Sequence, residues 1–169
     1  MLRKKLMLVV TFISMLAMTF AFALPVKAAT QNVENSIVDV ALAVNAQNGE
    51  FSTLIEAVLY TGLAPTLDGQ GQFTVFAPTD AAFASLGITA ANIRSFDKAF
   101  IKNVLLYHVA RGERFAADVV AASQIRMLNK GFTTISLDGG PQINGANIIA
   151  IDVDAGNGVI HVIDQVLLP

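Results

Sequence analysis

The run NGVIHVIDQVLLP, residues 157–169, places His161 inside an almost wholly apolar stretch. A histidine followed three residues later by Asp164 is compatible with a catalytic pair or a metal site. In a β-strand, however, side chains alternate between the two faces, so His161 and Asp164 would point in opposite directions, about 10 Å apart along the strand. Both faces of the run are mostly apolar, which is typical of a strand packed on two sides. The run therefore predicts a buried final strand in which His161 has a structural, hydrogen-bonded role.

The C-terminal third of the sequence has the composition and the turn signals of β-strands. Strands are predicted over residues 125–128, 132–137, 142–143, 148–153 and 159–168. Between them lie Asp138-Gly139, Asn144-Gly145 and Asn157-Gly158, dipeptides that two-residue hairpin turns favour because they tolerate positive φ. This part of the chain is expected to form an antiparallel meander.

Helices are predicted mainly before this region. They cover residues 36–46, a segment from 52 or 53 to a stop at Gly62, residues 81–86 and residues 97–107. The second of these is expected to begin with a capping box formed by Thr53 and Glu56. One aromatic strand, Phe73 to Phe76, lies between the second and third helices. Helices followed by a meander indicate an α+β fold.

The first 28 residues have the features of a secretory signal peptide. Arg3, Lys4 and Lys5 precede an uncharged apolar stretch, and small residues occupy the positions before Ala29. We expect cleavage after Ala28. An uncleaved anchor is the alternative, because the apolar stretch approaches the ~20 residues of a membrane-spanning helix.

Charge and cysteine content narrow the classes of partner. Four of the 11 basic residues and none of the 13 acidic residues lie in the leader, so residues 29–169 carry seven basic residues and a net charge of −6. This balance argues against nucleic acid or an anionic membrane as the partner. The sequence has no cysteine, which excludes disulfides, cysteine nucleophiles and thiolate metal sites.

Motifs for catalysis and metal binding are missing. The sequence has neither the glycine–serine elbow of hydrolases nor a phosphate-binding glycine loop. Asp152-Val153-Asp154 lacks the spacing of a calcium-binding EF-hand. His108, the only other histidine, has no nearby ligand at zinc-site spacing. We therefore predict no catalytic residue, no metal site and no cofactor.

Three separated motifs carry a family resemblance. FTVFAPTDAAF (73–83), LLYHV (105–109) and NGVIHVIDQVLLP (157–169) occur in the order of the H1 box, the YH motif and the H2 box of the fasciclin (FAS1) domain, which they resemble. The resemblance implies one domain over residues 29–169, built as a wedge or sandwich of two β-sheets with several helices packed alongside. The family-motif residues, expected to be structural, are Phe73, Phe76, Thr79, Asp80, Phe83, Tyr107, His108, Asn157, Gly158 and His161.

The resemblance also implies an exported module for adhesion or surface interaction, without enzymatic activity. It would be secreted, periplasmic or attached to the cell surface, and it would bind an extracellular protein or a surface glycan. Integrin binding, known in animal relatives, is not carried over, because residues 148–156 depart from their aspartate–isoleucine signal. The alternative is a soluble carrier of an apolar ligand such as a carotenoid. Its pocket would be lined by residues such as Phe73, Phe83, Phe100 and Ile101.

Two hypotheses concern individual residues. Thr79 is expected to cap the following helix, and Asp80 to lie in its first turn. His108, at a helix C-terminus where a cation is favoured, is hypothesised to join them in a hydrogen-bonded cluster. Possible contacts to a partner come from the YH motif and the loop after it, because arginine and aromatic residues are enriched at interfaces. These residues are Tyr107, Arg111, Arg114 and Phe115.

Overall fold

The computed structural model describes residues 35–169, so the predicted leader lies outside the described residues. The helices are α1 (Ile37–Asn48), α2 (Ser52–Thr61), α3 (Ala64–Leu67), α4 (Asp80–Ala84), α5 (Lys98–Tyr107) and α6 (Ala116–Ala121), with a short 3-10 helix η1 (Ile93–Ser95). The strands are β1 (Phe73–Pro78), β2 (Val109–Arg111), β3 (Gln124–Arg126), β4 (Phe132–Ser136), β5 (Gln142–Ile143), β6 (Ala146–Ala155) and β7 (Gly158–Ile163). The predicted α+β class is confirmed.

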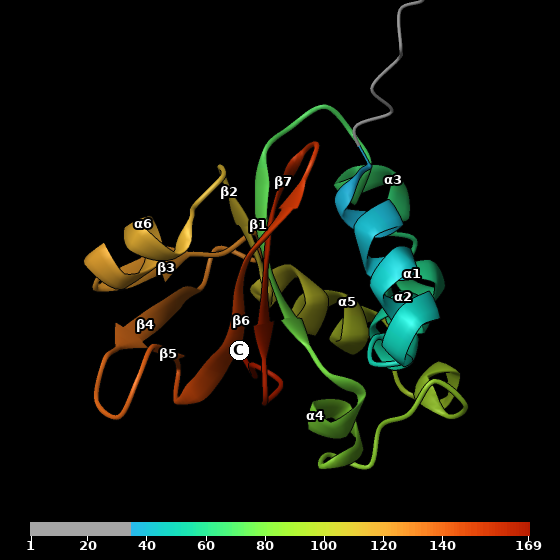
Figure 1. The fold of residues 1–169 in the computed structure, drawn as a ribbon. Helices are drawn as coiled ribbons and strands as arrows, with labels where there is room; N and C mark the ends of the chain where they lie inside the picture. Colours follow the sequence, from blue (N-terminus) through green and yellow to red (C-terminus); the bar gives the residue numbers. More distant parts are fainter. Residues whose placement is uncertain (1–34) are drawn as a thin grey trace, which may run out of the picture. The chain divides into compact units, whose positions relative to one another are not determined.

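The seven strands hydrogen-bond in the order β2-β1-β7-β6-β5-β4-β3. From β3 to β7 every pair is antiparallel and consecutive, as the meander prediction requires. β1 and β7 pair in parallel. The two ends of the order also meet, because Ala110 of β2 forms a bridge with Met127, one residue beyond β3. The strands thus form two groups, which we call limbs: β2–β1–β7–β6 and β5–β4–β3. The two limbs fold back toward each other (Figure 1).

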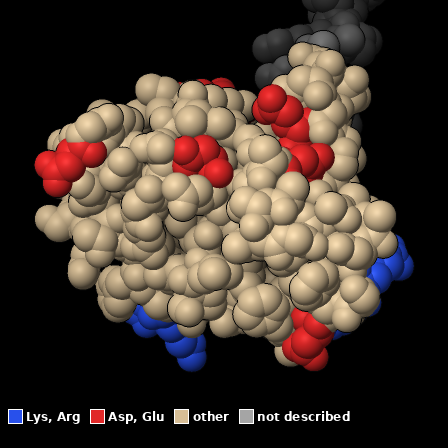
Figure 2. Space-filling view, turned by 90° about the horizontal axis from the view of Figure 1, so that it is seen from below, with Lys and Arg blue, Asp and Glu red and all other residues tan. Residues whose placement is uncertain are grey.

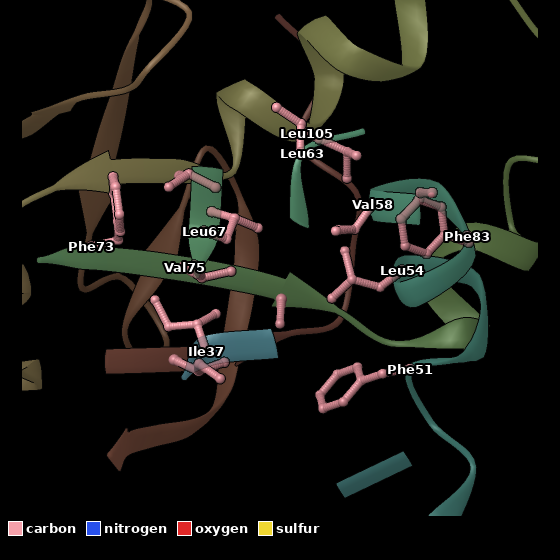
Figure 3. Packing of buried hydrophobic residues seen from close by; sticks show 14 of the residues in the cluster. Ile37, Phe51, Leu54, Val58, Leu63, Leu67, Phe73, Val75, Phe83 and Leu105 are labelled. Carbon is pink, nitrogen blue, oxygen red and sulfur yellow. The ribbon is translucent and has the colours of Figure 1, made fainter. Parts of the chain in front are cut away.

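The first hydrophobic core lies between the helices and one face of the β2–β1–β7–β6 limb. Leu54 and Val58 of α2, Leu105 of α5 and Val75 of β1 point into it (Figure 3). This arrangement follows from the apolar stripe of each helix, which must be buried against another element.

The second core lies between the two limbs of the sheet. Its buried members are Phe76, Tyr107, Ala110, Val119, Ile125, Met127, Ile143, Ala146, Ile163 and Leu167. Strand β7 contributes to both cores, since Ile160 and Val162 belong to the first and Ile163 to the second. All six residues of β7 are buried, which confirms the prediction of a strand packed on both sides.

The turn before β7 differs from the prediction by one residue. Ala155 pairs with Gly158, so the two turn residues are Gly156 and Asn157, and neither has a positive φ. Gly158 instead begins the strand, where a Cβ atom would lie 2.0 Å from the carbonyl oxygen of Phe73. Its hydrogen therefore permits the close approach of β1. At Asn144-Gly145 the prediction is confirmed, with φ of 48° and 82°.

Three other local predictions are wrong. Strand β7 ends at Ile163, five residues early, because the chain turns after it. Phe100, expected on the buried stripe of α5, is 47% exposed. The capping box of α2 does not form, because Phe51 occupies the N-cap position without a side-chain hydrogen bond and Glu56 pairs with Arg94.

Candidate functional site

His161 is fully buried and has a hydrogen-bond partner at each ring nitrogen. The backbone N–H of Asp152 donates to Nδ1 at 3.3 Å, and Nε2 lies 2.8 Å from the carbonyl oxygen of Arg114. These partners fit a neutral ring that is protonated on Nε2. The ring also stacks on Phe76, with centroids 5.5 Å apart.

The histidine compensates for an irregularity in the neighbouring strand. Strand β6 has a register shift between Ala150 and Val153, and Asp152 within it has a φ of 55°. An N–H group displaced from a ladder in this way needs another acceptor, and His161 supplies it. Asp164 bonds instead to the backbone and side-chain nitrogens of Asn147, so His161 and Asp164 have separate partners.

His108 connects the three sequence motifs. Its Nδ1 lies 2.7 Å from the carbonyl oxygen of Val104, and its Nε2 accepts the backbone N–H of Leu167 at 2.9 Å. Its own carbonyl oxygen accepts the N–H of Phe76. Because the side chain is 1% exposed, desolvation lowers the pKa of His108 from 6.5 to about 4. His108 is therefore a neutral residue in the core, and the expectation of a helix-end cation is wrong.

The hypothesised cluster of Thr79, Asp80 and His108 does not form. Thr79 caps α4 as predicted, accepting the N–H of Ala82 at 3.2 Å. The carboxylate of Asp80, however, accepts the N–H groups of Ser52 and Thr53 at 3.1 and 2.7 Å. Asp80 thus caps α2 from a distant part of the chain, where the positive end of the helix dipole favours an anion.

Tyr107 faces the second core and is 6% exposed. Its hydroxyl donates to the carbonyl oxygen of Phe132 at 2.8 Å and accepts from the side-chain amide of Asn144 at 2.9 Å. The Oδ1 atom of Asn144 in turn accepts the N–H of Thr134. Burial and these bonds leave Tyr107 no surface for a partner, which corrects its assignment as a partner contact.

The segment after the YH motif does reach the surface. Arg111 is exposed, Arg114 is half-buried and Phe115 is 42% exposed, directly before α6. Beside it, a groove of about 190 Å³ runs between α6 and β6. Its apolar rim includes Val120, 38% exposed, and Ile151, 52% exposed. The structure thus combines an exposed aromatic side chain and an apolar groove on this side of the sheet.

The apolar cavities do not match the lining predicted for a carrier. Phe83, Phe100 and Ile101 line a groove of about 220 Å³, whereas Phe73 packs in the first core outside it. A separate cavity of about 140 Å³ lies under α1, lined by aliphatic side chains, Phe51 and His108. A protein cavity of about 150 Å³ holds benzene. A carotenoid, with its long polyene chain, is much larger than this cavity.

Residues 35–169 contain neither a metal-binding cluster nor a membrane-spanning helix. No group of three or more histidine and acidic side chains in this range is placed to hold a metal ion. No helix in the same range is long and apolar enough to cross a membrane.

The arrangement of motifs and strands agrees with a known family. The family model of the Fasciclin domain matches residues 49–169, most of the chain. The chain belongs to the fasciclin domain family. Its fold is similar to that of a FAS1 domain pair from the insect cell adhesion molecule Fasciclin I, with a TM-score of 0.62 and 21% identity. That match covers 80% of this chain and 51% of the insect chain.

Curated relatives of this fasciclin domain come from bacteria and animals. Protein sll1483 of Synechocystis is 43% identical over 79% of this chain and 73% of its own length. Immunogenic protein MPB70 of Mycobacterium bovis is 31% identical over 76% of this chain and 68% of its own length. Transforming growth factor-beta-induced protein ig-h3 of Sus scrofa is 35% identical over 70% of this chain but 18% of its own length.

Two polar residues organise the site through partners that the sequence did not indicate: Asn157, expected in a turn and among the structural motif residues, and Asp152, for which no role was predicted. Asn157 accepts the N–H of Ile37 at 2.9 Å and donates to the carbonyl oxygen of Leu67, so it links the turn before β7 to α1 and α3. Asp152 accepts the N–H of Ala116 at 2.7 Å and so anchors the start of α6. A turn asparagine and an aspartate in a strand are weak signals, because both are also common on solvated surfaces.

Proposed function

We propose that this fasciclin domain is an exported, non-enzymatic module that binds a protein or glycan at a cell surface or in an extracellular matrix. The observation that carries the proposal is the exposed apolar surface along α6 and β6: Val120 and Ile151 line the groove, and Phe115 directly precedes α6. We call these three residues the α6–β6 patch. Exposed apolar side chains at a groove are typical of interaction sites.

The two histidines support a non-enzymatic role. His108 and His161 have both ring nitrogens engaged with backbone groups, and both side chains are almost completely buried. A general base needs a free nitrogen within hydrogen-bond reach of a substrate proton. Neither ring offers one in this arrangement.

The distribution of charge also fits an interaction surface. On the face drawn in Figure 2, acidic and basic side chains form small, separated groups within a wide uncharged area. The cores of protein interfaces are depleted in charged residues and enriched in aromatic residues and arginine. Arg111, which is exposed near Phe115 in the sequence, would contribute at the rim.

The experiment measures binding of the purified protein to immobilised cell-surface and matrix material from its own source. Phe115→Ser and Val120→Ser are expected to weaken binding by about tenfold or more if these side chains are at the centre of the interface. Leu59→Ser is the matched control, since Leu59 is 56% exposed on α2, outside the patch.

The result that contradicts the proposal is equally specific. If binding is unchanged in both patch variants while their melting temperatures equal that of the wild type, the patch is not the contact surface. If the wild-type protein binds the immobilised material no better than an unrelated protein of equal charge does, the proposed interaction function itself is wrong. An absorbance spectrum of the native protein tests the carrier alternative, because a bound pigment absorbs visible light.

A further inference from the structure

Helix α1 is the least buried long helix of the fold. Of its twelve residues only Ile37 is fully buried, whereas α2 buries five of its ten. Leu42, in the middle of α1, is 46% exposed. Val38, Val40 and Val44 pack against the first core but are only partly buried, so α1 buries less apolar surface than α2 and is held less firmly by it.

Cavities lie on both sides of this helix. The cavity of about 140 Å³ separates α1 from α2 and the sheet, and a second, of about 320 Å³, separates it from β6 and β7. Ala41 and Phe51 line both cavities. Side chains that face a void lose the dispersion contacts that a packed neighbour would give, which weakens the docking of α1 further.

The ends of α1 supply most of its specific attachment. At its start the N–H of Ile37 donates to Asn157, and the hydroxyl of Ser36 donates to Asp68 at 2.7 Å. At its end Asn45 accepts the N–H of Phe51 at 3.1 Å. The two bonds at the start of the helix join α1 to Asn157 and Asp68, which lie elsewhere in the fold. The α1 helix of a second copy could therefore make the same two bonds.

The connection from α1 to α2 is a short hinge. Only Gly49, Glu50 and Phe51 lie between the two helices. Gly49 turns the chain back with a φ of 74°, and a Cβ atom on it would touch nothing. The sharp reversal therefore depends on a left-handed backbone that other residues adopt at a cost. With Gly49 in a helical conformation instead, α1 would extend away from its own groove.

We propose that α1 exchanges between two copies of the chain, so that α1 of each copy occupies the groove between α2 and the β6–β7 face of the other. The occupant of the groove is α1 of a second copy, because that helix carries the same apolar residues at the same spacing and can make the same contacts. Exchange of an identical element across a short hinge is a low-cost route to a symmetric dimer. This interface goes beyond the proposed function and is independent of the α6–β6 patch.

Two single-cysteine variants of the protein detect the exchange. Val44 on α1 and Val153 on β6 line the same cavity, and the natural sequence has no cysteine. Copies of Val44→Cys and Val153→Cys that carry different tags are refolded together from urea and oxidised. A disulfide between the two tagged copies forms in an exchanged dimer and not between closed monomers. Val44→Cys with Ala99→Cys, on the exposed face of α5, is the control pair.

A substitution in the hinge between α1 and α2 provides a second test of the exchange. Gly49→Ala disfavours the closed turn and is expected to raise the dimer fraction, measured by light scattering, by about tenfold. Gly62→Ala is the matched control, because Gly62 ends α2 with a φ of 72° and has equal space around it. It should lower stability without producing dimers.

Two results would overturn the proposal. One is a Gly49→Ala protein that stays monomeric at every concentration, as Gly62→Ala does. The other is a cross-link between the cysteines at positions 44 and 153, in the otherwise wild-type mixture, that is no more abundant than in the control pair. A dimer without this cross-link also refutes exchange, because it uses another surface.

Discussion

Acidification is predicted to destabilise the protein through His108. Its pKa is about 4 in the folded state, against 6.5 for an exposed histidine. Between these values the unfolded chain binds a proton and the folded chain does not. The free energy of unfolding must therefore fall as the pH drops from 6.5 toward 4, and level off below.

The size of the effect follows from the difference between the two pKa values. The full loss is about 3 kcal/mol, and roughly 2 kcal/mol of it is reached by pH 5. The physical cause is that burial disfavours a charged ring, and a protonated Nε2 can no longer accept the hydrogen bond from the N–H of Leu167.

Urea unfolding followed by circular dichroism at pH 7.5, 6.5, 5.5 and 5.0 measures this loss. His108→Gln removes the titrating group, so its unfolding free energy should be lower at pH 7.5 but nearly independent of pH down to 5. His161→Gln serves as the control for the other histidine. The reasoning is refuted if the wild type shows no change over this range, or if His108→Gln keeps the full dependence. A ring-proton NMR signal of His108 that titrates near pH 6.5 in the folded protein would refute it directly.

Three further predictions concern stability. Asp80→Ala should lower the unfolding free energy by about 1–2 kcal/mol, because the start of α2 loses its cap, while Asp138→Ala in an exposed loop should change little; the urea midpoints decide. Gly158→Ala should cost about 3 kcal/mol or prevent folding, since its methyl group would overlap Phe73, and the soluble yield and melting temperature report this. Tyr107→Phe should cost about 1–2 kcal/mol in the same urea assay and leave partner binding unchanged, because the hydroxyl bonds only within the domain.

Much of the fold could be predicted because its signals are local. The apolar stripe of α5, the Asn144-Gly145 turn and the mostly apolar run of β7 each lie within about ten residues of sequence. Periodicity and turn chemistry act over this distance. The same stretches contain the motifs that resemble the fasciclin domain, so the family could also be inferred from sequence.

The site was harder to predict, because its bonds join residues far apart. Asp80 caps a helix that begins 28 residues earlier, and His108 accepts the N–H of a residue 59 positions later. A sequence shows that a buried polar group needs a partner, but it does not show which group will lie beside it. For that reason the sequence suggested Asp80 as a partner of His108, and it left Tyr107 with both a structural role and a possible partner contact.

The sequence by itself determined the fold class, the order of most elements and the burial of His161, because hydrophobic periodicity and side-chain alternation follow from backbone geometry alone. Only the tertiary structure decided the parallel pairing of β1 with β7, the neutral state of His108 and the role of Gly158 as a contact point rather than a turn residue. Each of these depends on what another part of the chain brings within a few ångströms. The run of residues 157–169 illustrates both points. Its apolar pattern predicts a buried strand, whereas the groups that hydrogen-bond to His161, from Asp152 and Arg114, are known only from the tertiary structure.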